Sequence, residues 1–180
     1  MDMAKINSEA LDNIMTRTSV RSYSTEKVTD AEIETIIKAA MAAPSAMNKQ
    51  PWHFFVIRGE KLRDTLADTL EYGRQSLRNC SAAIIVAGDR SRFFEDEDAV
   101  DYWVEDCSAA AENLLLAAHA ISLGAVWCGV YPIPSRAAQL RAATGIGGEY
   151  VPMCIIPVGH IEERQDPKDK WDPAKVTYLD

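Results

Sequence analysis

The sequence lacks the long apolar run that a membrane-spanning helix requires. A helix needs about 20 consecutive apolar residues to cross a bilayer, and no apolar stretch of this 180-residue chain is that long. The N-terminal residues are polar and contain no apolar signal-peptide core. We therefore expect a cytoplasmic protein with no membrane partner.

Positive charge is also scarce. The chain has 19 Lys and Arg against 27 Asp and Glu, which gives a formal net charge of −8. Nucleic-acid-binding proteins need a basic face, so this balance argues against a nucleic-acid partner. It does not exclude a phosphate ligand, because a local arginine cluster can oppose the sign of the net charge.

Cysteine and histidine are few, and their spacing does not match that of metal ligands. The four cysteines and three histidines form no Cys-x-x-Cys pair and no His-Glu-x-x-His helix. Three cysteines lie in apolar runs, so we expect reduced, buried thiols. A Gly-x-Ser-x-Gly elbow is absent, and residues 145–148 follow a predicted helix, unlike a dinucleotide fingerprint. If the chain is an enzyme, we expect a bound cofactor to carry the reaction.

The remaining composition is that of a folded globular protein. Hydrophobic residues make up 47% of the chain, which is enough for a substantial core. No linker, repeat or low-complexity tract divides residues 1–180, so we expect one domain. Residue patterns predict helices over residues 7–15, 29–43, 60–71, 108–123 and 135–144, and strands over residues 52–57, 82–88, 125–131 and 153–158. Asn7 or Ser8 caps the first helix, Thr29 and Glu32 form a capping box on the second, and Ser135 caps the last.

The predicted helix over residues 108–123 is apolar nearly all the way round. Such a helix is buried on every side, which is demanding for a chain of 180 residues. We therefore expect a second subunit to cover part of it, and its many alanines permit close approach of a partner backbone. Gly124 is expected to end the helix.

Residues 90–105 combine many acidic residues with Phe93, Phe94, Tyr102 and Trp103. A purely solvated acidic loop needs no aromatic side chains. The segment is therefore either a cap packed over the core or a mobile lid, and a surface helix with its charges outward is an equally good reading.

The stretch from Pro44 to Ile57 changes character halfway. Its first half is polar and turn-forming, whereas its second half, from Trp52, is aromatic and β-branched like a buried strand. Pro51 at the junction biases the preceding Gln50 toward extended geometry. A donor-rich loop at the mouth of a core strand is a common ligand position in α/β proteins, although an ordinary helix-to-strand loop has the same composition.

A second stretch, Arg17 to Tyr23, reads Arg-Thr-Ser-Val-Arg-Ser-Tyr. If it is extended, Arg17, Ser19 and Arg21 project to one side, because side chains alternate along extended backbone. Two guanidinium groups and a hydroxyl suit a phosphate. Taken alone, the same residues are also compatible with a solvated basic turn.

Together the two stretches resemble the flavin-dependent nitroreductase family. That family has Arg-x-Ser-x-Arg/Lys near its N-terminus and then Pro-Ser-x-x-Asn-x-Gln-Pro-Trp. The matching residues here are Arg17, Ser19, Arg21, Pro44, Ser45, Asn48, Gln50, Pro51 and Trp52. Weaker similarity continues at residues 126–129, 157–160 and 170–173. The resemblance implies an α+β fold with a mixed sheet flanked by helices, and an intertwined homodimer that binds FMN tightly and non-covalently at the subunit interface.

The resemblance also implies which residues bind FMN. Its phosphate is expected at Arg17, Thr18, Ser19 and Arg21, and at a basic residue near the C-terminus, where Lys170 matches best and Lys168 is the alternative. The loop with Pro44, Ser45, Asn48 and Gln50 is expected against the flavin ring from the partner subunit. Cys128 and Gly129 match a segment beside the ring, and Gly159 and His160 match a turn near the ribityl phosphate. Gly73 and Ser76 replace an Asn and Lys pair that some members use, so that contact is not carried over.

The implied activity is an oxidoreductase with two half-reactions at one site. NAD(P)H reduces FMN, and a nitroaromatic, quinone or similar acceptor then takes the electrons. An FMN storage or delivery protein would keep the phosphate motif without NAD(P)H turnover, and a specialised flavin enzyme such as a reductive dehalogenase is a further alternative. A protein without flavin would use the alanine-rich helix for interaction.

Overall fold

The computed structural model describes residues 8–69, 73–163 and 165–179. In order, its elements are α1 (Glu9–Thr16), α2 (Asp30–Met41), η1 (Ala46–Asn48), β1 (Trp52–Ile57), α3 (Glu60–Thr69), α4 (Arg74–Asn79), β2 (Ala82–Asp89), η2 (Arg90–Arg92), α5 (Tyr102–Ala120), β3 (Leu123–Ala125), β4 (Cys128–Gly129), α6 (Pro134–Thr144), β5 (Tyr150–His160) and η3 (Pro173–Lys175), where η marks a 3-10 turn. Asn7 and residues 70 and 71, which fell within predicted helices, lie outside the described residues.

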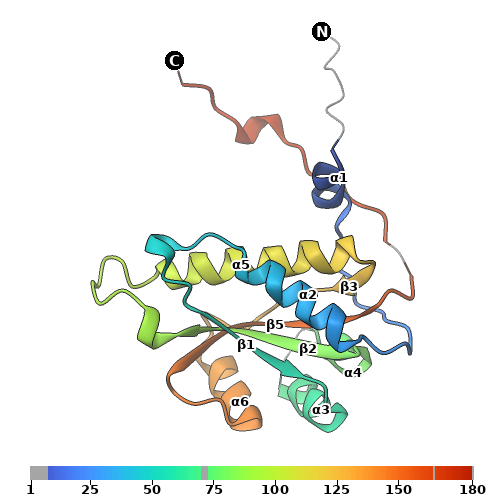
Figure 1. The fold of residues 1–180 in the computed structure, drawn as a ribbon, viewed down its shortest axis with the longest axis horizontal. Helices are drawn as coiled ribbons and strands as arrows, with labels where there is room; N and C mark the ends of the chain where they lie inside the picture. Colours follow the sequence, from blue (N-terminus) through green and yellow to red (C-terminus); the bar gives the residue numbers. More distant parts are fainter. Residues whose placement is uncertain (1–7, 70–72, 164, 180) are drawn as a thin grey trace.

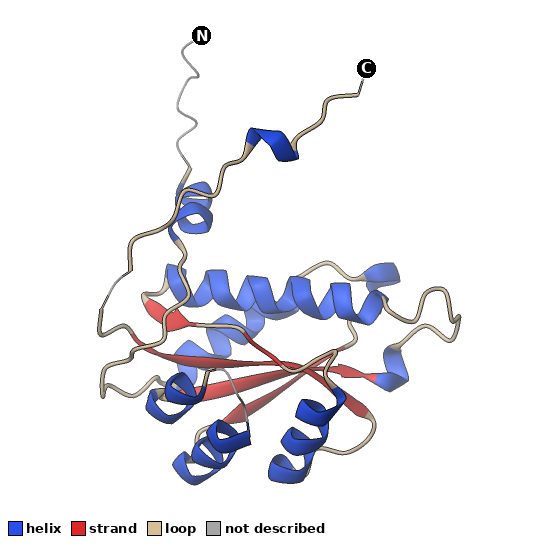
Figure 2. Ribbon diagram, turned by 180° about the vertical axis from the view of Figure 1, so that it is seen from behind, coloured by secondary structure: helices blue, strands red, loops and turns tan. Residues whose placement is uncertain are grey.

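The elements form three layers around one sheet (Figure 1). Helices α2 and α5 cover one face, and α3, α4 and α6 cover the other, as the view from behind also shows (Figure 2). The strand order is β1-β2-β5-β3, with β4 also paired to β5. The predicted α+β class is confirmed. The sheet was expected to be mixed, but every pairing between the described strands is antiparallel.

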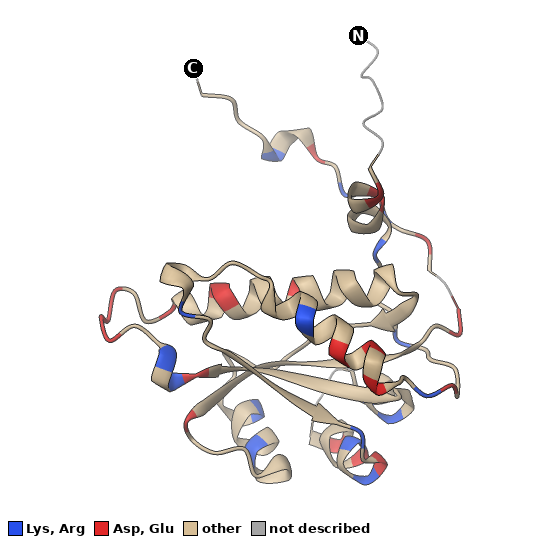
Figure 3. Ribbon diagram, viewed as in Figure 1, with Lys and Arg blue, Asp and Glu red and all other residues tan. Residues whose placement is uncertain are grey.

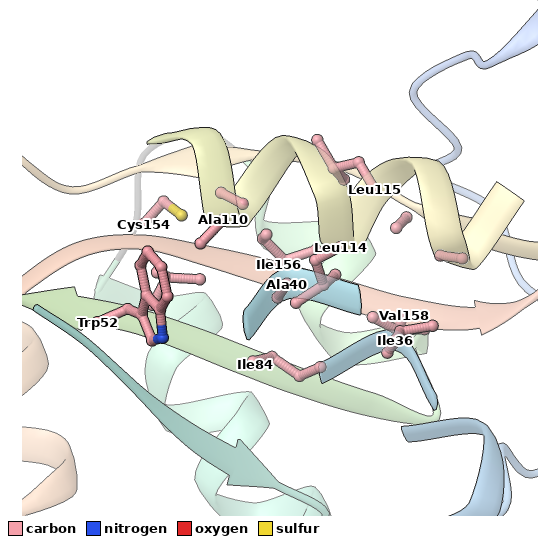
Figure 4. Packing of buried hydrophobic residues seen from close by; sticks show 14 of the residues in the cluster. Ile36, Ala40, Trp52, Ile84, Ala110, Leu114, Leu115, Cys154, Ile156 and Val158 are labelled. Atoms are coloured by element: carbon pink, nitrogen blue, oxygen red, sulfur yellow. The ribbon is translucent and has the colours of Figure 1, made fainter. Parts of the chain in front are cut away.

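The core consists of two apolar layers on the two faces of the sheet. On β2, Ala82, Ile84 and Val86 pack toward α2 and α5, whereas Ala83, Ile85 and Ala87 pack toward the opposite helices. Alternation along a strand sends neighbouring side chains to opposite faces, so a strand covered on both faces reads as one continuous apolar run. Figure 4 shows the first layer, where Ile36 and Ala40 of α2 lie with Leu114 of α5 above the sheet.

The ends of α2 follow the sequence prediction. The Thr29 side chain accepts a hydrogen bond from the Glu32 backbone N–H, and the Glu32 side chain accepts one from the Thr29 backbone N–H. That second bond lowers the pKa of the Glu32 carboxyl group and completes a capping box. The helix ends at Met41, before Pro44. Ser8 stands at the N-cap of α1 but makes no side-chain capping bond.

Helix α5 differs from its prediction at both ends. It begins at Tyr102 and ends at Ala120, so part of the acidic-aromatic segment is its first turn. Ser122, with φ of 64°, takes the left-handed position after the helix, and Gly124 lies in β3. Burial on every side is also wrong within one chain. Cys107, Ala111 and Leu114 are buried, whereas Ala109, Leu116 and Ala117 are only half-buried and Glu112 is exposed.

Two further boundaries were predicted imperfectly. The strand expected over residues 125–131 is broken into β3 and β4, which pair with different parts of β5. Helix α6 begins with Pro134 at its first position after Ile133, so Ser135 does not cap it. It ends, as expected, at Gly145, which has φ of 73°.

Two glycines allow the segment after α1 to cross the sheet closely. A Cβ on Gly124 would lie 2.6 Å from Val20 Cγ1, and a Cβ on Gly159 would lie 2.8 Å from the Tyr23 side chain. Gly124 and Gly159 are register partners on β3 and β5. Because these two positions have no side chain, residues 20–23 can pack directly against the backbone of β3 and β5.

Helix α1 and the C-terminal tail lie on the same side of the body (Figures 1 and 2). Helix α1 has no buried residue, and its apolar side chains Leu11, Ile14 and Met15 are exposed, as are Trp171, Tyr178 and Leu179 of the C-terminal tail. Among the described residues, no helix has the length and apolar character needed to span a membrane.

Candidate functional site

A cavity of about 510 Å³ lies where the segment after α1 meets the C-terminal tail. Its N-terminal wall contains Ile14, Met15, Arg17, Thr18, Ser19 and Arg21, and its C-terminal wall contains Gln165, Asp166, Lys168, Lys170 and Trp171. Every residue predicted from sequence for phosphate binding in the two end segments lines this cavity. Both tail lysines line it, so the structure does not single out Lys170 over Lys168.

Hydrogen bonds to the sheet and to α5 hold the arginine segment in place. The Val20 backbone N–H donates to the Ala125 carbonyl oxygen at 3.0 Å, and Tyr23 forms an isolated bridge with Ile161. On the other side, the Asn13 side-chain amide donates to the Leu116 carbonyl oxygen of α5 at 3.0 Å. The arginines are therefore carried by a short extended segment tied down at both ends.

Positive charge dominates this cavity. Four cations, Arg17, Arg21, Lys168 and Lys170, line it against the carboxylate of Asp166. The Arg17 side chain is 18% exposed, and its Nε lies 3.5 Å from a carboxylate oxygen of Glu112 on α5. Arg21 is exposed and donates to the Ser19 carbonyl oxygen at 3.2 Å. A partly buried guanidinium beside three more cations suits a phosphate dianion.

Several lining residues were missed from sequence. Ile14 and Met15 belong to the predicted apolar stripe of the first helix, and nothing local marks them as ligand-facing. Gln165, Asp166 and Trp171 lie in the charged tail, where the weak similarity at residues 170–173 was the available signal for Trp171. Their role depends on a tail that returns across the molecule to the N-terminal segment, and no sequence pattern predicts that path.

Cys128 and Gly129 lie on β4, where they pair with Ile155 and Cys154 of β5. Neither is part of the cavity lining. Burial raises the pKa of the Cys128 thiol to about 11, and the positive charge of Arg21 acts in the opposite direction. All four cysteines are free and buried, as predicted.

The structure does not bring Gly159 and His160 to the cavity wall. Gly159 is covered by Tyr23, and His160 Nε2 lies 3.8 Å from a Glu26 oxygen and 3.7 Å from a Glu32 oxygen. The His160 carbonyl oxygen accepts a hydrogen bond from the Ser24 backbone N–H. In this chain these two residues contact the end of the arginine segment, Gly159 at Tyr23 and His160 at Ser24.

The Pro44–Gln50 loop contacts the N-terminal part of α5. The Ala46 backbone N–H donates to Asp106 at 2.8 Å, whereas Arg17 pairs with Glu112, six residues further along α5. Six helical residues span about 9 Å. The two characteristic motifs of one chain therefore contact different turns of α5.

This loop is held in an unusual backbone conformation. Met47, Asn48 and Gln50 have φ of 50°, 55° and 49°, in the left-handed region that costs non-glycine residues about 1–2 kcal/mol each. The extended geometry expected for Gln50 before Pro51 is therefore wrong. Hydrogen bonds from the Gln50 backbone N–H to Ser45 Oγ and from the Gln50 amide to Asn48 Oδ1 hold the alternative. Backbone strain of this kind is common at ligand sites.

Comparison with known proteins identifies the family. The model of the nitroreductase family matches residues 14–75 and 69–160. The chain belongs to the nitroreductase family. An Archaeoglobus fulgidus protein named "Putative NADH dehydrogenase/NAD(P)H nitroreductase" is 41% identical over 93% of this chain and 96% of its own length. A Bacteroides thetaiotaomicron protein of the same name has a crystal structure that is 40% identical, with a TM-score of 0.89 over 96% of this chain and 98% of that one.

A further structural relative has been solved with FMN. It is a "putative nitroreductase in complex with fmn" from Desulfovibrio desulfuricans, 32% identical, with a TM-score of 0.84 over 97% of this chain and 98% of that chain. These likenesses cover nearly the whole chain, so both motifs and the tail lie within the compared region.

In this nitroreductase, the acidic-aromatic segment adjoins the Pro44–Gln50 loop. Arg92 donates to the Lys49 carbonyl oxygen at 3.3 Å, and the Lys49 ammonium lies 5.0 Å from the centre of the Phe94 ring. Phe93 stacks on Trp103 with ring centres 5.0 Å apart, and both pack against the core. These two aromatics cap the core, whereas residues 95–98 are exposed acids on the loop at the left of Figure 3.

Proposed function

We propose that this chain is an FMN-dependent oxidoreductase that uses NAD(P)H to reduce nitroaromatic, quinone or similar acceptors. The observation that carries the proposal is the cavity in which Arg17, Ser19 and Arg21 meet Lys168 and Lys170. Two segments at opposite ends of the sequence supply the donor set that a phosphate monoester requires. The name of the Desulfovibrio relative's complex supports FMN as the molecule that carries this phosphate.

The side chains present fit that cofactor by their chemistry. Arginine and lysine side chains would hold its phosphate, and the Thr18 and Ser19 hydroxyls add neutral hydrogen-bonding groups. Ile14, Met15 and Trp171 offer apolar surface beside the cations. When bound, FMN supplies the redox chemistry, taking electrons from NAD(P)H and passing them to an acceptor.

The protein's own part is binding and orientation. The four cations anchor the phosphate at one end of the ligand. Backbone and side-chain donors of the Pro44–Gln50 loop, together with the Cys128–Gly129 backbone, are proposed to lie beside the ring. Donors at that position stabilise negative charge on a reduced ring, because fixed dipoles need no reorganisation during the reaction.

We further propose that two chains form each site. Within one chain Arg17 and the Pro44–Gln50 loop contact α5 at residues about 9 Å apart along the helix, and we propose a second chain as the source of the loop in each site. Helix α1 without a buried residue, the exposed tail and the half-buried side of α5 leave apolar surface for that partner. An obligate dimer of this kind should bury more than about 2,000 Å².

The activity is tested by anaerobic reduction of the purified protein with NADH and with NADPH, followed by a panel of acceptors. We expect the flavin absorbance to bleach with at least one donor and to recover when a nitroaromatic or quinone is added. Bound FMN that neither donor reduces would instead support the storage or delivery alternative. A colourless preparation that refuses added FMN would overturn the flavin proposal.

The assembly is tested separately by sedimentation at micromolar protein concentration. We expect a dimer with and without added FMN, because the proposed interface rests on protein surface rather than on the ligand. A stable monomer that retains FMN would contradict the shared site while leaving the phosphate cavity intact.

A further inference from the structure

A second cavity, of about 280 Å³, lies beside the segment that follows the arginine motif. It is bounded by residues 23–27, by the first turns of α3 and by residues 78–81 at the end of α4. None of its lining residues belongs to the lining of the first cavity. The proposed binding of FMN and its redox partners gives this second cavity no role.

The wall of this second cavity contains a buried arginine. Arg63 is 4% exposed, and its Nη1 donates to the carbonyl oxygens of Arg58 and Ser81. Its Nε is buried and has no hydrogen-bond partner. No carboxylate of the described residues forms an ion pair with it. A buried cation with no counter-charge among its described neighbours is in an unfavourable position, so this guanidinium can still bind an anion.

The surrounding residues strengthen that capacity. Lys27 and Arg78 also line the cavity and are exposed at its mouth, where Arg78 is engaged with Asp68. Two carboxylates, Glu26 and Glu60, line it as well, but both are exposed, so water screens their charge. The most buried charged group in the cavity wall is therefore the positive Arg63, and its charge is screened least by water.

We propose that this cavity binds a small phosphate dianion through Arg63, with Arg78 and Lys27 at its entrance. The guanidinium fork offers donors in the geometry that a tetrahedral oxyanion accepts. The cavity is about half the volume of the first one, which suits inorganic phosphate rather than a nucleotide. The proposal is independent of flavin binding.

The test uses NMR of the arginine Nε–H groups in the full-length protein, titrated with inorganic phosphate at constant ionic strength set by chloride. The buried Nε–H of Arg63 should shift saturably, with a dissociation constant in the millimolar range. Arg141 is a matched internal control, because its Nε is the other buried atom without a partner among the described residues and it lines neither cavity. Its signal should stay in place.

Variants separate the two cavities and the roles of the lining residues. Arg78→Gln should weaken phosphate binding up to about tenfold, and Glu60→Gln should strengthen it. Arg17→Ala with Arg21→Ala, which alters the first cavity alone, should leave the Arg63 shift unchanged. Arg63→Lys assigns the signal, and through-bond correlation from the backbone assigns it if that variant does not fold. An Arg63 signal that stays still up to about 50 mM phosphate, or that moves only in step with Arg141, overturns the proposal.

Discussion

Removing Arg17 should weaken the binding of FMN far more than the binding of riboflavin. Riboflavin lacks the phosphate but has the same ring, so it reports everything except the proposed anion contact. A hydrogen bond to a charged group contributes about 1.5–3 kcal/mol, and each tenfold in affinity corresponds to about 1.4 kcal/mol. Arg17→Ala should therefore raise the FMN dissociation constant about 10- to 150-fold.

The surroundings of the two arginines predict different magnitudes. The Arg17 side chain is 18% exposed and lies 3.5 Å from Glu112, so its loss removes a partly buried positive charge and leaves the carboxylate of Glu112 without its partner. Arg21 is exposed, and water screens its charge. Arg21→Ala should therefore fall at the lower end of the range. The double variant should cost less than the sum of the two if Ser19 and a tail lysine move to the same phosphate.

The assay is a fluorescence titration of the apo-protein with FMN and with riboflavin. Glu112→Gln is a matched control: it removes the partner of Arg17 but keeps the arginine, and FMN affinity should hold or rise. Neither arginine variant should unfold the protein, because Arg21 is exposed and the partner of Arg17, Glu112, is half in water. An ion pair screened in this way contributes about 1 kcal/mol, which shifts Tm by roughly 2–4 °C. Equal loss of affinity for both ligands would refute the phosphate assignment.

Three further predictions test other parts of the structure. Phe94→Ala should change the relative rates of reduction across acceptors while leaving FMN affinity intact, and unchanged rates across a varied acceptor panel would contradict this prediction. Phe93→Ala should instead lower the free energy of unfolding by about 2–3 kcal/mol, because Phe93 stacks on Trp103 in the core. Gly159→Ala should destabilise the fold by about 1–3 kcal/mol and weaken FMN binding, since the new Cβ would lie 2.8 Å from Tyr23, and Gly148→Ala, with open space around it, is the neutral control in a denaturant titration. Burial raises the pKa values of the Cys80 and Cys128 thiols from 9.0 to about 11, so the folded chain keeps these protons longer than the unfolded chain, and the free energy of unfolding should fall between about pH 9 and 11. Native thiols should also resist a thiol reagent at pH 8 and react after unfolding. The Cys80→Ala, Cys128→Ala variant should lose less stability over this pH range, and the remaining loss should come from Cys107, Cys154 and Tyr23, whose pKa values burial also raises.

Most of the regular structure could be read from local patterns. The capping box at Thr29 and Glu32, the buried strand over residues 82–88 and the stop at Gly145 depend on residues within one or two turns of each other. Errors arose where contacts distant in sequence decided the outcome. Trp103 draws the first turn of α5 onto the core, and two hydrogen bonds within the loop override the usual preference of Gln50 before a proline.

For the candidate site too, local sequence determined some features and tertiary packing determined the others. The sequence alone determined which side chains suit a phosphate, because Arg17, Ser19 and Arg21 stand two residues apart on extended backbone and the family motif names them. Only the tertiary structure decided that the tail brings Lys168 and Lys170 to the same cavity, that Glu112 pairs with Arg17, and that the Pro44–Gln50 loop contacts the N-terminal part of α5. The physical reason is that the spacing of neighbouring side chains follows from local backbone geometry, whereas contacts across more than a hundred residues depend on how helices and strands pack. The same packing explains why positions 124 and 159 are glycine, because Val20 and Tyr23 cross above them and leave no room for a side chain.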